Sequence, residues 1–179
     1  MTTKTVQDLN VLGQAARKAS RTVARLSTDD KNRVLLNLAD LLKSDQAGVL
    51  AANQQDYQEA KSEGMDESLL DRLLLTEERL NGTAEEVRRV AELPDPVGEV
   101  LETTNLPNGL ITSRRRVPLG VVGSIYESRP NVTIDVFGLC LKSGNACFLR
   151  GGKETIRSNM ALVSLLRKAL TEAGVTTDA

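Results

Sequence analysis

The 179-residue sequence contains no histidine and no tryptophan, and it has only two cysteines. Without histidine, the chain cannot build the Ser–His or Cys–His pair that many hydrolases use, nor a zinc site with histidine ligands. Cys140 and Cys147 belong to no CxxC pattern. The sequence therefore predicts no metal site and no histidine-activated nucleophile.

Aromatic residues are also scarce, at 2% of the chain, which excludes the stacking platforms of single-stranded nucleic-acid binders. The 23 basic and 24 acidic side chains nearly cancel, so no overall charge favours nucleic acid or anionic lipid. The longest apolar-rich stretch, residues 132–141, contains Asp135 and is too short to span a bilayer. No apolar signal segment follows Met1. We therefore expect a cytoplasmic protein without nucleic-acid or membrane partners.

The first half of the chain is patterned as helices. Apolar residues recur at helical spacing between positions 6 and 26, and again after the capping cluster at 27–30. Further helices are expected at 45–63, which Gly64 would end, at 66–74, and from Thr76 to just before Pro94. Their apolar stripes need a surface to pack against.

The pattern changes after Pro94 and Pro96. Two strands are expected at 99–104 and 110–117 around a turn-forming cluster, followed by strand 120–125, helix 130–142, strand 146–149 and helix 155–173. This order predicts an α/β fold, in which a helical N-terminal region packs on the start of a parallel sheet with an inserted β-hairpin. The predicted parts are residues 1–98, 99–117 and 118–179.

Polar residues follow both predicted parallel strands at the edge where open α/β sheets bind ligands. Residues 126–131 follow the first strand and residues 150–154 follow the second, each with cations at the start of a helix, so each is a candidate anion site. There is no GxGxxG fingerprint after the first strand, and 151–153 lacks the upstream glycine of a P-loop.

Several of these residues also have purely structural interpretations. Cys140 and Cys147 are typical of small core residues. The arginines at 114–116 alternate on a strand and favour solvated or edge-protecting groups, with salt bridges in an oligomer as the alternative. Arg150 and Lys153 can serve as surface ion pairs, and Arg129 and Asn131 as helix caps.

The stretch 116–154 also resembles a known family. Its residues follow the pattern of the aldehyde dehydrogenase superfamily at Pro118, Gly120, Val121, Gly123, Ile125, Gly144, Asn145 and Arg150. The segments ESRPNVT at 127–133, LKSGNA at 141–146 and LRGGKE at 149–154 are closer to the γ-glutamyl phosphate reductases within it. KNRVL, LLDRL and DPVGEV, near positions 31, 69 and 95, add to this similarity.

The resemblance implies NADPH-dependent reduction of L-glutamyl 5-phosphate to L-glutamate 5-semialdehyde in proline biosynthesis. It implies that the nucleophilic cysteine, the rest of the sheet and the catalytic domain lie beyond Ala179, so this chain holds no catalytic residue. By the same resemblance, Arg129 and Asn131 are candidates for the oxyanion or the substrate phosphate.

The resemblance also implies four cofactor-binding residues: Tyr126, Ser128, Arg150 and Lys153. Arg150 ends the strand whose basic residue reaches the adenine ribose in this superfamily. NAD-using members often carry Glu where this sequence has Lys153, which favours NADPH. A homo-oligomer formed through the hairpin, and the glutamate 5-kinase of the same pathway, are the implied protein partners.

Two alternatives stay open at this stage. The chain could be a stand-alone, non-catalytic nucleotide-binding or scaffolding module. It could also belong to a reductase of the same superfamily that acts on another acyl donor.

Overall fold

The structure is a computed structural model that describes residues 9–179. Its elements are α1 (Leu9–Val23), α2 (Thr28–Ser44), α3 (Gln46–Ser62), α4 (Glu67–Leu73), α5 (Glu77–Glu92), β1 (Val100–Asn105), β2 (Ile111–Arg115), β3 (Val121–Ile125), α6 (Val132–Lys142), β4 (Ala146–Arg150), the 3₁₀ turn η1 (Lys153–Thr155) and α7 (Ile156–Glu172). The α/β fold class and each predicted element are confirmed to within a few residues. The predicted start of the first helix, at Val6, lies outside the described residues.

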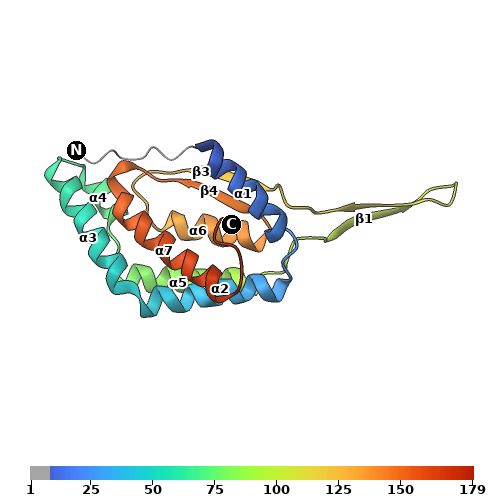
Figure 1. The fold of residues 1–179 in the computed structure, drawn as a ribbon, viewed down its shortest axis with the longest axis horizontal. Coiled ribbons are helices and arrows are strands. Elements are labelled where there is room, and N and C mark those ends of the chain that lie inside the picture. The colour runs from blue at the N-terminus through green and yellow to red at the C-terminus, as the bar shows by residue number, and fades with distance from the viewer. Residues whose placement is uncertain (1–8) are drawn as a thin grey trace.

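The parallel strands β3 and β4 form a small sheet between α1 and α6 (Figure 1). Helix α1 covers one face of this sheet, α6 packs on the other with α7 beside it, and α2 and α5 form a further layer below (Figure 1). The apolar faces of the amphipathic helices predicted from the sequence therefore pack partly on the sheet and partly on one another.

One continuous core joins these layers. Leu35, Leu38 and Leu42 of α2 are fully buried, and they belong to the same apolar cluster as Ile134 of α6 and Leu162 of α7. Burying a leucine side chain stabilises a fold by about 1.5–3 kcal/mol, so this cluster is the main source of stability. No helix within residues 9–179 is both long and apolar enough to cross a bilayer.

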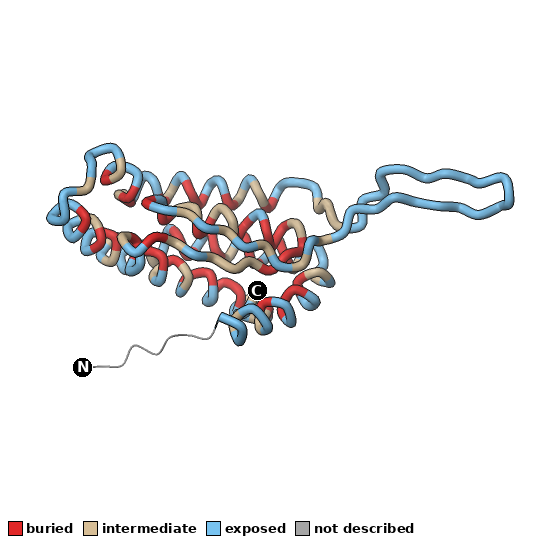
Figure 2. The backbone as a smooth tube through the Cα atoms, turned by 90° about the horizontal axis from the view of Figure 1, so that it is seen from above, coloured by how far each residue is buried: buried red, intermediate tan, exposed pale blue. Residues whose placement is uncertain are grey.

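The hairpin β1–β2 projects away from this body, and its residues are exposed along both strands (Figure 2). Two of its three consecutive arginines are paired within the hairpin: Arg116 lies 2.8 Å from Glu99, and Arg114 lies 3.7 Å from Glu102. All three are exposed, in agreement with their interpretation as solvated strand-edge groups.

The junction between α6 and β4 fixes the start of β3. Gly144 ends α6 at φ 76°, and a Cβ there would lie 2.8 Å from Pro118. The side-chain oxygen of Asn145 accepts a 2.8 Å hydrogen bond from the backbone N–H of Gly120. Gly144 is thus required by conformation and close approach, and Asn145 aligns the two parallel strands.

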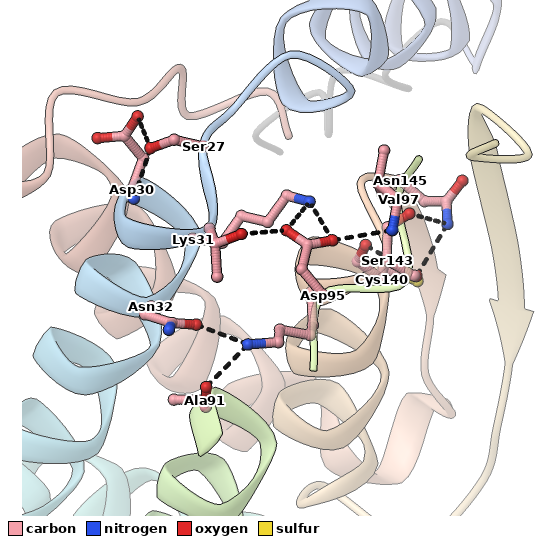
Figure 3. Close-up of polar contacts among 12 residues, drawn as sticks. Ser27, Asp30, Lys31, Asn32, Ala91, Asp95, Val97, Cys140, Ser143 and Asn145 are labelled. Carbon is pink, nitrogen blue, oxygen red and sulfur yellow. Dashed lines mark hydrogen bonds and ion pairs between the residues drawn. The ribbon is translucent and has the colours of Figure 1, made fainter. Parts of the chain in front are cut away.

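A buried ion pair holds the root of the hairpin against the helices (Figure 3). Lys31 of α2 is 0% exposed and lies 2.8 Å from Asp95, which also accepts from the backbone N–H of Val97. Burial alone would raise the pKa of Asp95, but the hydrogen bonds from Lys31, Val97 and Thr28 outweigh it and lower this pKa. Nearby, the buried Lys142 donates to the carbonyl of Ala91 at 2.8 Å.

Asp95→Ala should strongly destabilise the protein. It leaves the ammonium of Lys31 buried without its partner, a change that costs about 3–5 kcal/mol. Thermal unfolding should show a Tm several degrees lower, whereas Lys43→Ala, which breaks the exposed pair with Glu85, should leave Tm nearly unchanged. Equal shifts in the two variants would contradict a special role for the buried pair.

Candidate functional site

The carboxyl ends of β3 and β4 lie side by side. Ile125 pairs with Arg150 at the last position of the parallel register, and the backbone N–H of Tyr126 donates to the carbonyl of Arg150 at 3.1 Å. The two polar segments singled out from the sequence, 126–131 and 150–154, therefore leave the sheet at one edge. This is the edge where open α/β sheets bind ligands.

Tyr126 lies beneath the loop after β4 rather than facing outward. Its hydroxyl and that of Thr133 are 2.6 Å apart, and Thr133 also donates to Asn159 of α7. Burial raises the pKa of Tyr126, so it stays a neutral phenol. A Cβ at Gly151 would lie 2.0 Å from Asn159 and also close to Tyr126, so the loop backbone needs glycine there.

Ser128 and Glu154 connect the two loops. Ser128 is buried and adopts φ 49°, the only positive φ outside glycine among the described residues. Its backbone N–H (2.7 Å) and its hydroxyl (3.0 Å) both donate to one carboxylate oxygen of Glu154. Backbone strain of this kind collects at functional sites, where surrounding contacts hold it in place.

The same contacts change the electrostatics of Glu154. Burial on its own would raise the pKa of this carboxyl group, but hydrogen bonds from its own backbone and from Ser128 outweigh burial and lower it. Glu154 is therefore an ionised carboxylate fixed between the two loops. The sequence did not reveal this contact, because Ser128 lies 26 residues away from Glu154.

The backbone N–H groups at the starts of α6 and α7 are already hydrogen-bonded within the protein. At the start of α7, the buried Asp56 of α3 accepts from the N–H of Ser158 at 2.7 Å and from that of Arg157 at 3.4 Å. At the start of α6, the N–H groups of Val132 and Thr133 donate to carbonyls of the preceding turn. Asn131 occupies the N-cap position of α6, but its side chain makes no capping hydrogen bond.

Arg150 and Lys153 are exposed at this edge, and neither forms an ion pair within residues 9–179. Lys153 lines a small hollow that also contains Glu59, Glu63 and Glu154, so carboxylates partly compensate its charge. Arg150 lies outside this hollow. Arg150 is therefore the less compensated of the two cations available to an anionic ligand.

Arg129 and Asn131 face a different surface. They line a groove of about 360 Å³ between the α4–α5 connection and the start of α6, to which Arg72, Thr83 and Glu86 also contribute. Arg129 is exposed, and the amide of Asn131 donates to Asp135 at 3.1 Å. The structure thus separates the predicted site residues, with Arg150 and Lys153 beside one loop and Arg129 and Asn131 on the groove.

Asp135 is a feature that the sequence did not identify as functional. Burial first, and the nearby charge of Glu86 second, raise the pKa of its carboxyl group to about 6. Its carboxylate accepts a hydrogen bond from the neutral amide of Asn131, and no cation pairs with it in the described part of the chain. The available signal was a charged residue within an otherwise apolar helix.

Neither cysteine is suited to nucleophilic attack. Cys140 is buried, and burial raises the pKa of its thiol. Burial, together with the neighbouring Cys140, raises the pKa of Cys147 to about 12. A nucleophilic thiolate needs a lowered pKa, so the interpretation of both as core residues agrees with the structure. Residues 9–179 also bring together no cluster of side chains that could hold a metal ion.

Comparison with known proteins identifies the family. Residues 1–177 match the aldehyde dehydrogenase family, and the chain belongs to it. A γ-glutamyl phosphate reductase of Pectobacterium carotovorum is 56% identical over 93% of this chain and 40% of its own length. The chain therefore spans about two fifths of this relative.

Solved structures give the same result. The crystal structure of γ-glutamyl phosphate reductase from Thermotoga maritima matches with a TM-score of 0.92 and 39% identity, over 95% of this chain and 41% of that one. The Saccharomyces cerevisiae enzyme matches with a TM-score of 0.89 and 32% identity, over 94% and 44%. The family fold implies a nicotinamide cofactor.

Proposed function

We propose that this chain is the N-terminal part of a γ-glutamyl phosphate reductase, which converts L-glutamyl 5-phosphate and NADPH into L-glutamate 5-semialdehyde, phosphate and NADP⁺ in the cytoplasm. The observation that carries the proposal is the match of nearly the whole chain to γ-glutamyl phosphate reductases, at 56% identity to a bacterial one. The paired loops at the carboxyl edge of β3 and β4 supply a site of the required kind.

On this proposal, the groove side of the edge binds the reacting acyl group. Arg129 offers a guanidinium without an ion-pair partner in the described residues, and Asn131 offers an amide next to it. Such donors stabilise negative charge that develops on an acyl oxygen or a leaving phosphate. Glu154 holds the turn that carries them, through its two hydrogen bonds with Ser128.

The full-length gene product should oxidise L-glutamate 5-semialdehyde with NADP⁺ only when inorganic phosphate is present, which is the reverse of the proposed reaction. The rate of NADPH formation, measured by absorbance at the NADPH band, reports this reaction directly. Residues 1–179 alone should be inactive, because their thiols have raised pKa values. Comparable rates with simple aldehydes, or with another acyl donor, would indicate a different reductase of the superfamily.

The residues at the cofactor side fit the adenosine end of NADPH, which supplies the hydride when bound. Arg150 and Lys153 are exposed cations at the end of β4, and Gly151 lets the backbone lie close to α7. Tyr126 and Ser128 direct their hydroxyl groups to protein partners, so on this proposal they shape the loops from inside.

Lys153→Glu in the full-length protein should lower the ratio of kcat/KM for NADPH to that for NADH by about ten- to a hundredfold. A charge-assisted contact with the 2′-phosphate would be replaced by repulsion. Glu67→Gln, on the exposed first turn of α4, is a suitable control. An unchanged ratio would mean that Lys153 is only a solvated charge in its acidic hollow.

We further propose that the hairpin joins subunits of a homo-oligomer. Ile111 is 72% exposed and Leu110 is 60% exposed near the tip of an element that makes its strand pairs only within itself. Deleting residues 103–112 from the full-length protein should lower its mass in sedimentation. An unchanged mass would place the subunit contact elsewhere.

The glutamate 5-kinase of the same pathway remains a proposed partner.

A further inference from the structure

The groove beside Arg129 and Asn131 continues past these donors toward two carboxylates. Glu86 of α5 lines it directly. Asp135 of α6 lies behind the groove residue Asn131, whose amide donates to it at 3.1 Å, and the charge of Glu86 acts on its carboxyl group. The groove thus has a cationic and amide part where α6 begins, formed by Arg129 and Asn131, and an acidic part at Glu86 of α5, while Arg72 and the Arg79–Asp71 pair also line it.

The acidic part is poorly compensated by the protein itself. Asp135 is partly buried, and among the described residues its side-chain partner is a neutral amide, that of Asn131. Glu86 has one cation, Arg89, at 3.7 Å, and both side chains of that pair are largely exposed. A partly buried carboxylate without a cation carries an unfavourable desolvation free energy. A bound ammonium group would offset this cost by its opposite charge.

The groove is also of a suitable size. Its volume, about 360 Å³, lies in the range typical of small-molecule sites. A Cβ added at Gly82, on its wall, would meet no atom within 4 Å. A short ligand with an anionic group at one end and an ammonium at the other matches this distribution of charge.

We infer that Asp135, assisted by Glu86, binds the α-ammonium group of the amino-acid substrate while Arg129 and Asn131 hold its acyl end. The inference rests on the proposed function, because it assigns a role in recognising that substrate. It makes Asp135 the residue that distinguishes an amino-acid semialdehyde from the same aldehyde without its amino group.

The test compares two substrates in the full-length protein, with NADP⁺ and phosphate: L-glutamate 5-semialdehyde and its des-amino analogue, 5-oxopentanoate. Asp135→Asn should lower kcat/KM for the first about ten- to a hundredfold, the loss expected for one charge-assisted hydrogen bond. The value for 5-oxopentanoate should change by less than about threefold, since no ammonium is present. Asp29→Asn, on the exposed first turn of α2, is the matched control.

The outcomes separate the inference from the proposed function. A wild-type protein that uses neither substrate would refute the proposed function itself. A wild-type protein active on L-glutamate 5-semialdehyde, with an Asp135→Asn variant that loses activity on both substrates equally or on neither, would refute the ammonium site alone.

Thermal unfolding distinguishes a binding role from a structural one. Folding raises the pKa of Asp135 from 3.8 to about 6, so the ionised carboxylate opposes folding at neutral pH, and this opposition fades as pH falls toward 4. Besides Glu86, the group that faces it is the amide of Asn131. Asp135→Asn should therefore raise Tm at pH 7.5 and raise it less at pH 5. A lower Tm at pH 7.5 would show that Asp135 supports the fold instead.

Discussion

The ion pair between Lys31 and Asp95 is the contact on which the arrangement of the parts depends. It joins α2 to a residue 64 positions further along the chain, in the loop between α5 and the hairpin. Asp95 also orders Val97, and Val97 packs with Pro118 against Gly144. The pair thus determines where the hairpin leaves the body and where β3 enters the sheet, and Asn145 then sets the register of β3 with β4.

At the carboxyl edge of that sheet, most hydrogen-bond donors of the loops already have acceptors within the protein. Asp56 takes the N–H groups at the start of α7, and Glu154 takes both donors of Ser128. This internal pairing makes the loops rigid, which is what a site needs in order to hold a ligand in one geometry. The groups left for a ligand are side chains: Arg150 and Lys153 on one side, and Arg129 and Asp135 near the groove.

Local chemistry explains what the sequence could predict. Helix periodicity, the Ser27 and Thr76 caps and the left-handed Gly64 and Gly144 act over a few residues, so the elements could be placed from the sequence. The resemblance at 116–154 located the site loops. Contacts between segments far apart in the chain could not be predicted from the sequence. Asp56 accepts a hydrogen bond from Ser158, 102 residues away. Glu86 lies near Asp135 only because α5 packs on α6.

We propose that the carboxyl edge of β3 and β4 holds the cofactor and leads into the substrate groove. A crystal structure of the full-length protein with NADP⁺ tests this most directly. We expect the 2′-phosphate within hydrogen-bonding distance of Arg150 or Lys153, and the nicotinamide directed toward Arg129 and Asn131. A cofactor bound at the other end of the sheet, or away from both loops, would contradict it.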